Sequence, residues 1–268
     1  MHKDMLKTIA VVNQKGGVGK TTTIINLATA LSAVGQKVLV IDLDPQGNAS
    51  TGLGVENQER KKTIYDLLID SSLKADDCTY ETNVNGLYLI PATMDLAGAE
   101  IDLFEQRDKQ FVLKNKIQDL KKRISGIQYD FILIDCPPSL GMLTINAMCA
   151  SDTLIIPMQC EFFALEGLSH LLKTFKSIKK TLNPSLEIEG LLLTMYDIRN
   201  KLTSQVEEDV RSFLGEKVYK TVIPRNIKVS EAPSHGKPVI VHDINCSGSV
   251  AYINLAKEII SANNIKIN

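Results

Sequence analysis

Short apolar runs alternate along the chain with stretches in which apolar residues recur at three- and four-residue spacing. The runs are short enough to be buried parallel strands, and the stretches between them are typical of helices. This alternation is characteristic of βαβ units and predicts an α/β fold, a doubly wound, mostly parallel sheet with helices on both faces. The predicted strands are 8–13, 37–44, 87–91, 131–135, 153–157, 188–195 and 217–223.

Helical periodicity is clearest at 111–124, 165–182 and 203–214, and a further helix is expected to follow the first strand. In that helix one face is apolar and Gly35 provides the stop signal, the face consisting of Ile24, Leu27, Ala28, Leu31 and Val34. Residues 54–62 and 71–85 are polar and predict surface loops or short helices. The polar tail, 261–268, is expected to fray.

Composition narrows the class of protein. The chain has 268 residues with 44% hydrophobic content, enough for one large core, so we expect a single domain over 1–268. The net charge of −1 provides no global basic field, and any DNA binding must come from a local patch or from dimerisation. Five cysteines without a C-x-x-C pair argue against a disulfide framework or a zinc site. Without a signal peptide or an apolar run long enough to span a bilayer, a cytoplasmic protein is expected.

A glycine-rich segment, KGGVGKTT at 15–22, lies between the first apolar run and the helix that follows it. Its end matches the Walker A pattern G-x-x-x-x-G-K-[ST], but Gln14 stands at the opening glycine position and a second lysine follows it. In this context the segment predicts a loop that binds a nucleotide polyphosphate. We expect Lys20 to reach the terminal phosphates and Thr21 to bind Mg²⁺. The predicted nucleotide-binding residues here are Lys15, Gly16, Gly17, Val18, Gly19, Lys20, Thr21 and Thr22.

Carboxylates end two of the predicted strands. Asp42 and Asp44 stand two residues apart, and Pro45 prevents the ladder from continuing. A carboxylate near the γ-phosphate can direct the attacking water, and one near Mg²⁺ can hold its hydration shell. Asp135 ends an apolar strand in Walker B form, which predicts a residue facing Mg²⁺. Asp42 and Asp135 are therefore the candidate metal residues besides Thr21.

In order and spacing, these motifs resemble the ParA/Soj branch of the deviant Walker A P-loop ATPases, which partition chromosomes and plasmids. The resemblance covers nearly the whole chain. It rests on four segments: NQKGGVGKTT at 13–22, DLDPQGN at 42–48, QCEFFALEG at 159–167 and VIPRNIKVSEAPSHGKP at 222–238. The last two distinguish this branch from its cousins in the superfamily.

The resemblance implies a weak, partner-stimulated ATPase that uses ATP and Mg²⁺ and forms an ATP-dependent sandwich dimer. In that dimer Lys15 reaches the partner's phosphates, as a flexible point charge can, while Lys20 acts within its own subunit. Asp44 is assigned to water activation, and Pro224 and Asn226 are placed beside adenine. These implied roles make Lys15 and Asp44 the candidate catalytic residues.

The same family binds double-stranded DNA non-specifically through basic residues of the dimer and works with a ParB/Spo0J-like partner at the nucleoid. The matching candidates for DNA contacts are Arg199 and Lys228. Lys228 stands where close relatives often carry Arg, so it keeps the charge without the guanidinium fork.

Three alternative functions differ in the sequence features that each requires. A MinD-like membrane ATPase needs a basic amphipathic C-terminal helix, but in 250–262 the only charges are Lys257 and Glu258, which predicts a packed helix and no stable membrane association. A nitrogenase-reductase-like protein needs cysteines that bridge a cluster between subunits, and Cys136 lies beside the Walker B acid instead. A nucleotide-dependent switch acting on replication initiation or transcription remains open.

Overall fold

The computed structural model describes residues 6–122, 126–263 and 265. Their strands form one seven-stranded sheet in the order β3-β4-β2-β5-β1-β6-β7, parallel except for β3, which pairs antiparallel with β4. The strands are β1 (Lys7–Val11), β2 (Val38–Asp42), β3 (Tyr80–Glu81), β4 (Leu87–Ile90), β5 (Phe131–Asp135), β6 (Thr153–Gln159) and β7 (Glu187–Thr194). Six of the seven predicted strands are present, and the predicted fold class is confirmed.

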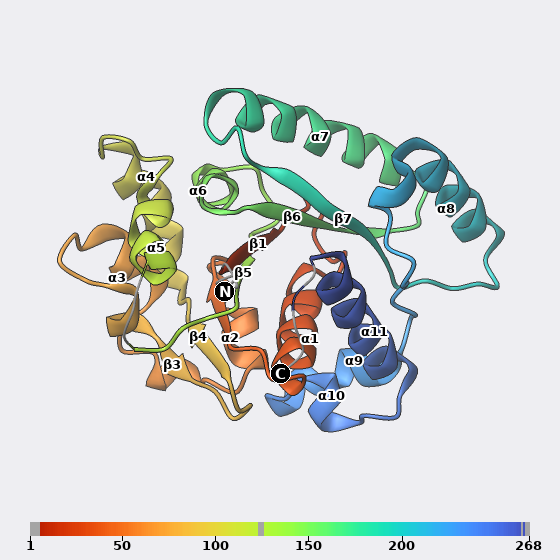
Figure 1. The fold of residues 1–268 in the computed structure, drawn as a ribbon, viewed down its shortest axis with the longest axis horizontal. Helices are drawn as coiled ribbons and strands as arrows, with labels where there is room; N and C mark the ends of the chain where they lie inside the picture. The colour runs from red at the N-terminus through yellow and green to blue at the C-terminus, as the bar shows by residue number, and fades with distance from the viewer. Residues whose placement is uncertain (1–5, 123–125, 264, 266–268) are drawn as a thin grey trace.

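Helices cover both faces of the sheet (Figure 1). On one face pack α3 (Ile64–Ile69), α4 (Ala99–Phe104), α5 (Val112–Lys122), α6 (Met142–Ala150), α7 (Ala164–Thr181) and α8 (Lys201–Leu214). On the other pack α1 (Lys20–Ala33), α2 (Asn48–Gly52), α10 (Val239–His242) and α11 (Ser247–Ala262), and α9 (Ile227–Glu231) precedes α10. Within each central strand, successive residues alternate between the two apolar cores because side chains alternate across a sheet.

Short 3₁₀ turns lie in both polar stretches, 54–62 and 71–85, and in three other connecting segments. They are η1 (Asn57–Glu59), η2 (Ala75–Cys78), η3 (Met94–Gly98), η4 (Gly215–Lys217) and η5 (Ala232–His235). The polar stretch 71–85 also contains the two-residue strand β3, which its composition did not indicate. Half of the tail that was expected to fray, 264 and 266–268, lies outside the described residues, and α11 continues to Ala262.

The predicted strand at 217–223 is wrong. Isolated bridges link this segment to the sheet edge, at Leu191 with Val218 and at Tyr196 with Pro224, and the Ile223 N–H donates to the Leu193 carbonyl at 2.8 Å. Between them, the backbone N–H groups of Lys220 and Thr221 donate to the two carboxylate oxygens of Glu258 on α11, at 2.7 and 3.1 Å. Because a side chain takes these donors, a continuous ladder with β7 cannot form.

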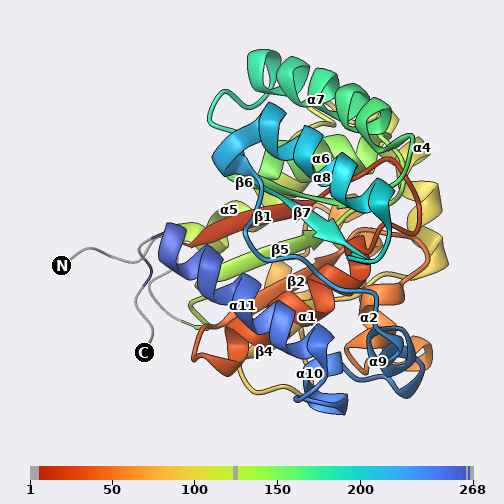
Figure 2. The same ribbon diagram turned by 90° about the vertical axis from the view of Figure 1, so that its right-hand side faces the viewer.

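The C-terminal helix α11 is packed into the molecule beside α1 (Figure 2). Tyr252, Leu255 and Ile259 are fully buried, and the Tyr252 hydroxyl lies 3.5 Å from that of Thr23 on α1. The predicted packed helix at 250–262 is therefore confirmed, with its start at Ser247. Within the described residues, no helix combines the length and apolarity needed to cross a bilayer.

Asn183, just beyond α7, closes the C-terminal end of α6. Its buried amide donates to the carbonyls of Met148, Cys149 and Ser151 at 2.9, 3.4 and 2.9 Å. We expect Asn183→Ala to lower the free energy of unfolding by about 1–3 kcal/mol, because buried carbonyls lose their partner. Urea unfolding measures this, with Asn245→Ala, at an exposed position, as the control. Equal midpoints for Asn183→Ala and the wild type would contradict this role.

Candidate nucleotide site

The loop between β1 and α1 has the backbone of a phosphate-binding loop. Gly17 and Gly19 adopt φ of 74° and 87°, in the left-handed region that favours glycine. Gly19 is the N-cap of α1, and because it has no side chain it cannot cap the first amides of this helix. Free amides at a helix N-terminus, together with the helix dipole, favour an anion at this position.

The loop is attached to the sheet at several points. The Thr194 hydroxyl at the end of β7 donates to the Val18 carbonyl at 2.8 Å, and the Asn13 amide donates to the Pro157 carbonyl at 2.7 Å. The Asn13 side-chain oxygen in turn accepts from the Lys15 N–H at 3.0 Å. These bonds hold the loop backbone against β6 and β7.

Lys20, the first residue of α1, is 6% exposed, and its ammonium donates to the Lys15 carbonyl at 3.2 Å. Burial lowers the pKa of Lys20, while the charges of Asp135, Cys136 and Asp44 act in the opposite direction. A buried cation thus lies across the loop, where phosphate oxygens would be its natural partners.

Asp42 and Asp135 are neighbours in the ladder between β2 and β5, and both are fully buried. One Asp42 oxygen accepts from the N–H and hydroxyl of Ser50 on α2 at 2.8 and 2.6 Å, and the other accepts from the Asp44 N–H at 3.3 Å. Burial raises the pKa of Asp42 to about 6, against the opposing effect of these hydrogen bonds. Asp42 thus anchors the turn after β2, and its metal role stays a prediction.

Asp135 presents the only buried carboxylate of the described residues in which neither oxygen has a hydrogen-bond partner of ordinary geometry. Burial, followed by the charge of Asp42, raises the pKa of Asp135 well above its usual value. Thr21 and Lys20 act in the opposite direction, so the Thr21 hydroxyl lies close enough to favour the ionised form. An unmet buried carboxylate beside a threonine hydroxyl fits a divalent cation.

The surroundings of Asp135 suit Mg²⁺ in particular. Within the described residues, no three His, Cys, Asp or Glu side chains form a complete metal cage. Mg²⁺ is commonly held by one or two carboxylates together with water and substrate phosphates. The residues present therefore fit Mg²⁺ bound with a nucleotide, with Thr21 and Asp135 as its protein contacts.

Asp44, which is 8% exposed, shapes the turn after β2. Its carboxylate accepts from the Gln46 N–H at 3.0 Å, and its carbonyl accepts from the Gly47 N–H at 2.9 Å. The charge of Asp44 acts on Lys20 and on Asp135, so the side chain lies in the same charged cluster. Its predicted role with the attacking water remains a prediction.

Lys15 differs from Lys20 in its surroundings. About half of its side chain is exposed, and its ammonium forms an ion pair with Glu161, in the turn between β6 and α7. The loop thus carries one buried lysine that faces the carboxylates and one that faces outward. The expected contact of Lys15 with a second subunit stays a prediction.

The two residues expected beside adenine lie past the end of β7. Pro224 pairs with Tyr196 by an isolated bridge. The Asn226 side-chain oxygen accepts from the Lys228 N–H at 2.8 Å and caps α9, and its amide donates to the Ser247 hydroxyl at 2.8 Å. These bonds hold the segment to α11, and the adenine contact stays a prediction.

Both candidate DNA-contacting residues have an acidic neighbour. The Arg199 guanidinium donates to both Asp197 oxygens at 2.9 and 2.8 Å, and this contact lowers the pKa of Asp197 to about 2. The Lys228 ammonium lies 3.1 Å from a Glu231 oxygen. Arg199 and Lys228 are both exposed, so phosphate groups could still compete for them.

Sequence reasoning missed three residues that shape the site. Ser50 holds Asp42, Thr194 holds the loop, and Glu161 pairs with Lys15. Only Glu161 stood in a segment that the resemblance had singled out, without an assigned role. Ser50 and Thr194 act through contacts with distant parts of the chain that no local pattern signals.

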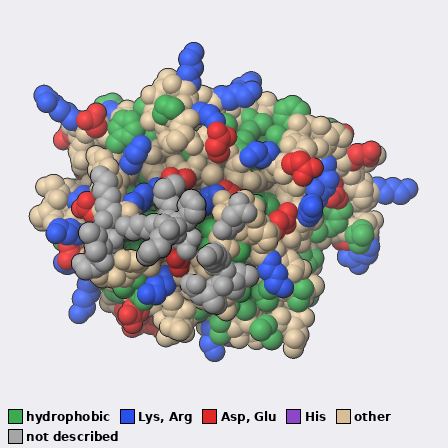
Figure 3. All heavy atoms as spheres, viewed as in Figure 1, with side chains coloured by type: hydrophobic (Ala, Val, Ile, Leu, Met, Phe, Trp, Pro, Cys, Tyr) green, Lys and Arg blue, Asp and Glu red, His purple; other side chains and the backbone are tan. Residues whose placement is uncertain are grey.

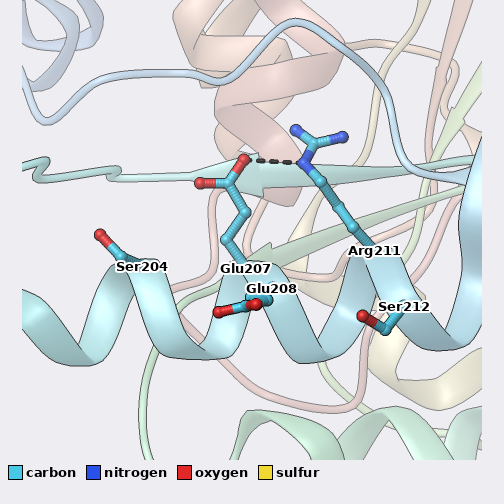
Figure 4. A pocket seen from close by; sticks show the side chains of 5 residues that line it. All are labelled: Ser204, Glu207, Glu208, Arg211 and Ser212. Carbon is cyan, nitrogen blue, oxygen red and sulfur yellow. Dashed lines mark hydrogen bonds and ion pairs between the residues drawn. The ribbon is translucent and has the colours of Figure 1, made fainter.

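A separate hollow of about 470 Å³ lies over α8, lined by Ser204, Glu207, Glu208, Arg211 and Ser212. Figure 4 shows that Glu207 and Arg211 point toward each other, and their ion pair measures 2.7 Å. Arg211 also donates to the Tyr219 carbonyl at 3.1 Å. The charges of this pair are satisfied within the protein, and the hollow gives no sign of a ligand.

Together, the loop, the buried lysine and the two strand-end carboxylates define the class of the protein as a P-loop nucleotide-binding protein with a second lysine in its loop. A family model described as AAA domain matches residues 6–188. The chain is 52% identical over 261 residues to the chromosome partitioning protein ParA of Caulobacter vibrioides strain NA1000 / CB15N, covering 97% of this chain and 96% of that protein.

A second relative is the sporulation initiation inhibitor protein Soj of Bacillus subtilis strain 168, 52% identical over 255 residues, covering 95% of this chain and 98% of Soj. Among solved structures, cobyrinic acid a,c-diamide synthase from Mycobacterium smegmatis with bound ADP and magnesium is 33% identical with a TM-score of 0.80, covering 94% and 93% of the two chains. The chain belongs to the ParA/Soj family of chromosome-partitioning ATPases.

The raised pKa of Asp42 predicts how stability depends on pH in the absence of nucleotide. Between the usual value of 3.8 and about 6, Asp42 binds more protons in the folded state than in the unfolded state, so its contribution to stability falls as the pH rises through this window. Asp42→Asn keeps an oxygen for Ser50 and removes this charge. From pH 4 to pH 7 we expect its stability relative to the wild type to rise by up to about 3 kcal/mol.

Urea unfolding at pH 4, 5.5 and 7 without nucleotide or Mg²⁺ measures this difference. Taking the variant relative to the wild type cancels the titration of carboxylates that do not interact with Asp42, so the remaining difference belongs to Asp42 and its neighbour Asp135. A difference that stays constant with pH would show that Asp42 does not titrate in this range.

Proposed function

We propose that this chain, as one domain over 1–268, binds ATP with Mg²⁺, hydrolyses the β–γ phosphoanhydride and drives DNA partition. The observation that carries the proposal is the unpartnered, buried carboxylate of Asp135 beside the phosphate loop and Lys20. The name of the C. vibrioides relative and the ADP and magnesium of the M. smegmatis structure support it.

In this proposal the chain supplies most of the binding through prearranged groups. The N-terminus of α1 and Lys20 hold the β- and γ-phosphates, and the loop around Gly17 and Gly19 shapes the cradle. Thr21 and Asp135 hold the cation, and Asp42 lies next to Asp135 in the ladder between β2 and β5. Mg²⁺, when bound, neutralises charge on the phosphate oxygens.

The hydrolytic step is assigned to two residues of different position. Asp44 orients the attacking water, since a carboxylate held at this edge can accept its hydrogen bond. Lys15, delivered from a second subunit in an ATP-dependent dimer, offsets charge on the transferred phosphoryl group as an arginine finger does. Slow basal turnover follows because a single subunit lacks this cation, and a ParB/Spo0J-like partner is proposed to stimulate it.

We assign the dimer to non-specific binding of duplex DNA in the cytoplasm at the nucleoid, with a chromosome or a plasmid as cargo. Burial of Tyr252 and Ile259 supports a role without stable membrane association, because these apolar side chains of α11 pack in the core and are not exposed to a membrane surface. The name of the B. subtilis relative favours a second role, a nucleotide-dependent regulatory switch. The same ATP-driven change of state would serve both roles.

The two lysines of the loop give the sharpest test. Lys20→Ala is expected to weaken ATP binding by about 30-fold or more, since loss of a buried charge partner costs ~2 kcal/mol or more. Lys15→Ala should bind ATP within about threefold of the wild type, yet hydrolyse it about a thousandfold more slowly. Calorimetry and a phosphate-release assay measure the two effects.

Lys180→Ala, at an exposed position of α7, is the matched control and should change neither quantity. Normal turnover by Lys15→Ala would overturn the trans role of this lysine. Undiminished ATP affinity in Lys20→Ala would overturn the assignment of the phosphate site.

DNA binding should depend on ATP and on salt, and hardly on sequence. Figure 3 shows Lys and Arg side chains interspersed with Asp and Glu on the visible face, in keeping with the net charge of −1. A monomer therefore has little attraction for DNA, and doubling its small basic surface should decide binding. Arg199→Ala or Lys228→Ala should weaken binding to every duplex alike, without affecting ATP affinity.

Fluorescence anisotropy with two duplexes of unrelated sequence, with and without ATP and Mg²⁺, measures this at several salt concentrations. Lys257→Ala, at an exposed position of α11, is the control. The salt slope should fall by about one for each phosphate contact removed. Equal affinity without ATP, or loss of preference for one sequence alone, would contradict the prediction.

A further inference from the structure

The Lys15 side chain forms an ion pair within its own chain. Its ammonium pairs with the Glu161 carboxylate, 146 residues away in the chain, and both side chains are partly exposed, at 51% and 42%. The contact lies beside the nucleotide loop, yet neither the family resemblance nor the hydrolytic role assigned to Lys15 uses it.

We propose that Glu161 is a positioning residue that holds Lys15 within the free subunit and releases it when a second copy of the chain docks. This inference rests on the proposed function, in which Lys15 acts on the partner's phosphates. It adds a residue that sets how readily the free subunit enters the dimer.

The topology explains why these two residues meet. Lys15 follows β1 and Glu161 follows β6, and these neighbouring parallel strands pair at Val11 with Ile155. Both side chains therefore leave the same edge of the sheet. The bond from the Asn13 amide to the Pro157 carbonyl, at 2.7 Å, holds the two connecting segments together. The backbone is held in place, so exchange of the lysine requires only rotation of its side chain.

The turn that carries Glu161 also exposes apolar side chains of the kind found in protein–protein interfaces. Phe162 and Phe163 follow it directly, are 76% and 69% exposed, and contact each other edge to face with ring centroids 5.0 Å apart. Exposing two aromatic rings to water is unfavourable in free energy, and such rings are typical of the anchor residues of interfaces. Their place beside Lys15 favours a second copy as the occupant, since Lys15 itself must reach one.

The strength of the contact suits a reversible restraint. A partly exposed ion pair contributes at most about a fivefold preference, or ~1 kcal/mol, and is weakened by salt. A polyphosphate carries more negative charge than one carboxylate, so it can compete successfully for the ammonium. A symmetric dimer uses two such lysines, and releasing both changes the dimer dissociation constant by up to about 25-fold.

The opposite arrangement makes the opposite prediction. If Glu161 instead bound the partner's Lys15 across the interface, removing its charge would weaken the dimer. The sign of the change in dimer affinity therefore decides between a restraint in the free subunit and a contact between subunits.

The test is sedimentation velocity of the full chain with Mg²⁺ and AMPPNP, which is hydrolysed far too slowly to complicate the measurement, over a range of protein concentrations. Glu161→Gln is expected to lower the dimer dissociation constant by about 2- to 25-fold, and the effect should shrink as salt is raised. Glu161→Asp keeps the charge and should stay within about twofold of the wild type. Nucleotide affinity of the monomer should be the same in all variants.

The matched control is Glu166→Gln, which removes an equal charge from an exposed position in the first turn of α7. An unchanged or higher dissociation constant for Glu161→Gln would overturn the restraint while leaving the proposed function standing. An equal gain from Glu166→Gln would also overturn it, because net charge would then be the cause. A wild-type chain that stays monomeric with AMPPNP would overturn the proposed dimer and the restraint together.

Discussion

Three carboxylates and one ammonium meet at the buried carboxyl edge of the central strands, and this unequal set of charges governs the site. Asp42 and Asp135 are adjacent in the β2–β5 ladder because the register of the parallel sheet aligns them. Burial disfavours their charged forms, and each disfavours ionisation of the other. Lys20 offsets only part of this negative charge. The free protein therefore carries an electrostatic cost at this edge that a bound divalent cation can relieve.

Asp42 and Asp135 are equally buried, but their carboxylates differ in their hydrogen-bond partners. Asp42 is satisfied by Ser50, and through it by α2, so its charge is used to hold the segment that carries Asp44. Asp135 has no such partner and remains available. Burial also separates the two lysines of the loop, since Lys20 is fixed among the carboxylates and Lys15 is free to rotate once it leaves Glu161. Two residues of one type, five positions apart, thereby acquire different capabilities.

Most of the sheet could be predicted because its central strands are apolar on both faces, which leaves a strong local signal. The failure at 217–223 arose from Glu258, a residue of the last helix that takes the N–H donors of the segment. The phosphate loop and its strand-end acids were predictable because their chemistry requires fixed residue types at fixed spacing. Contacts such as Ser50 with Asp42, or Glu161 with Lys15, were not, because they join distant parts of the chain through the fold.

The charged pairs at the surface explain how a nearly neutral chain could switch its affinity for DNA, if it binds DNA as proposed. Arg199 and Lys228 lie against Asp197 and Glu231, so each cation must leave or share its acid before it contacts a phosphate. This competition reduces the attraction of a single subunit, which already has a net charge of −1. DNA binding then requires several weak contacts at once. Pairing two subunits only doubles the number of cations, but the affinity for DNA rises by a much larger factor because the contacts form together. Assembly, rather than a change in the residues themselves, would control DNA binding.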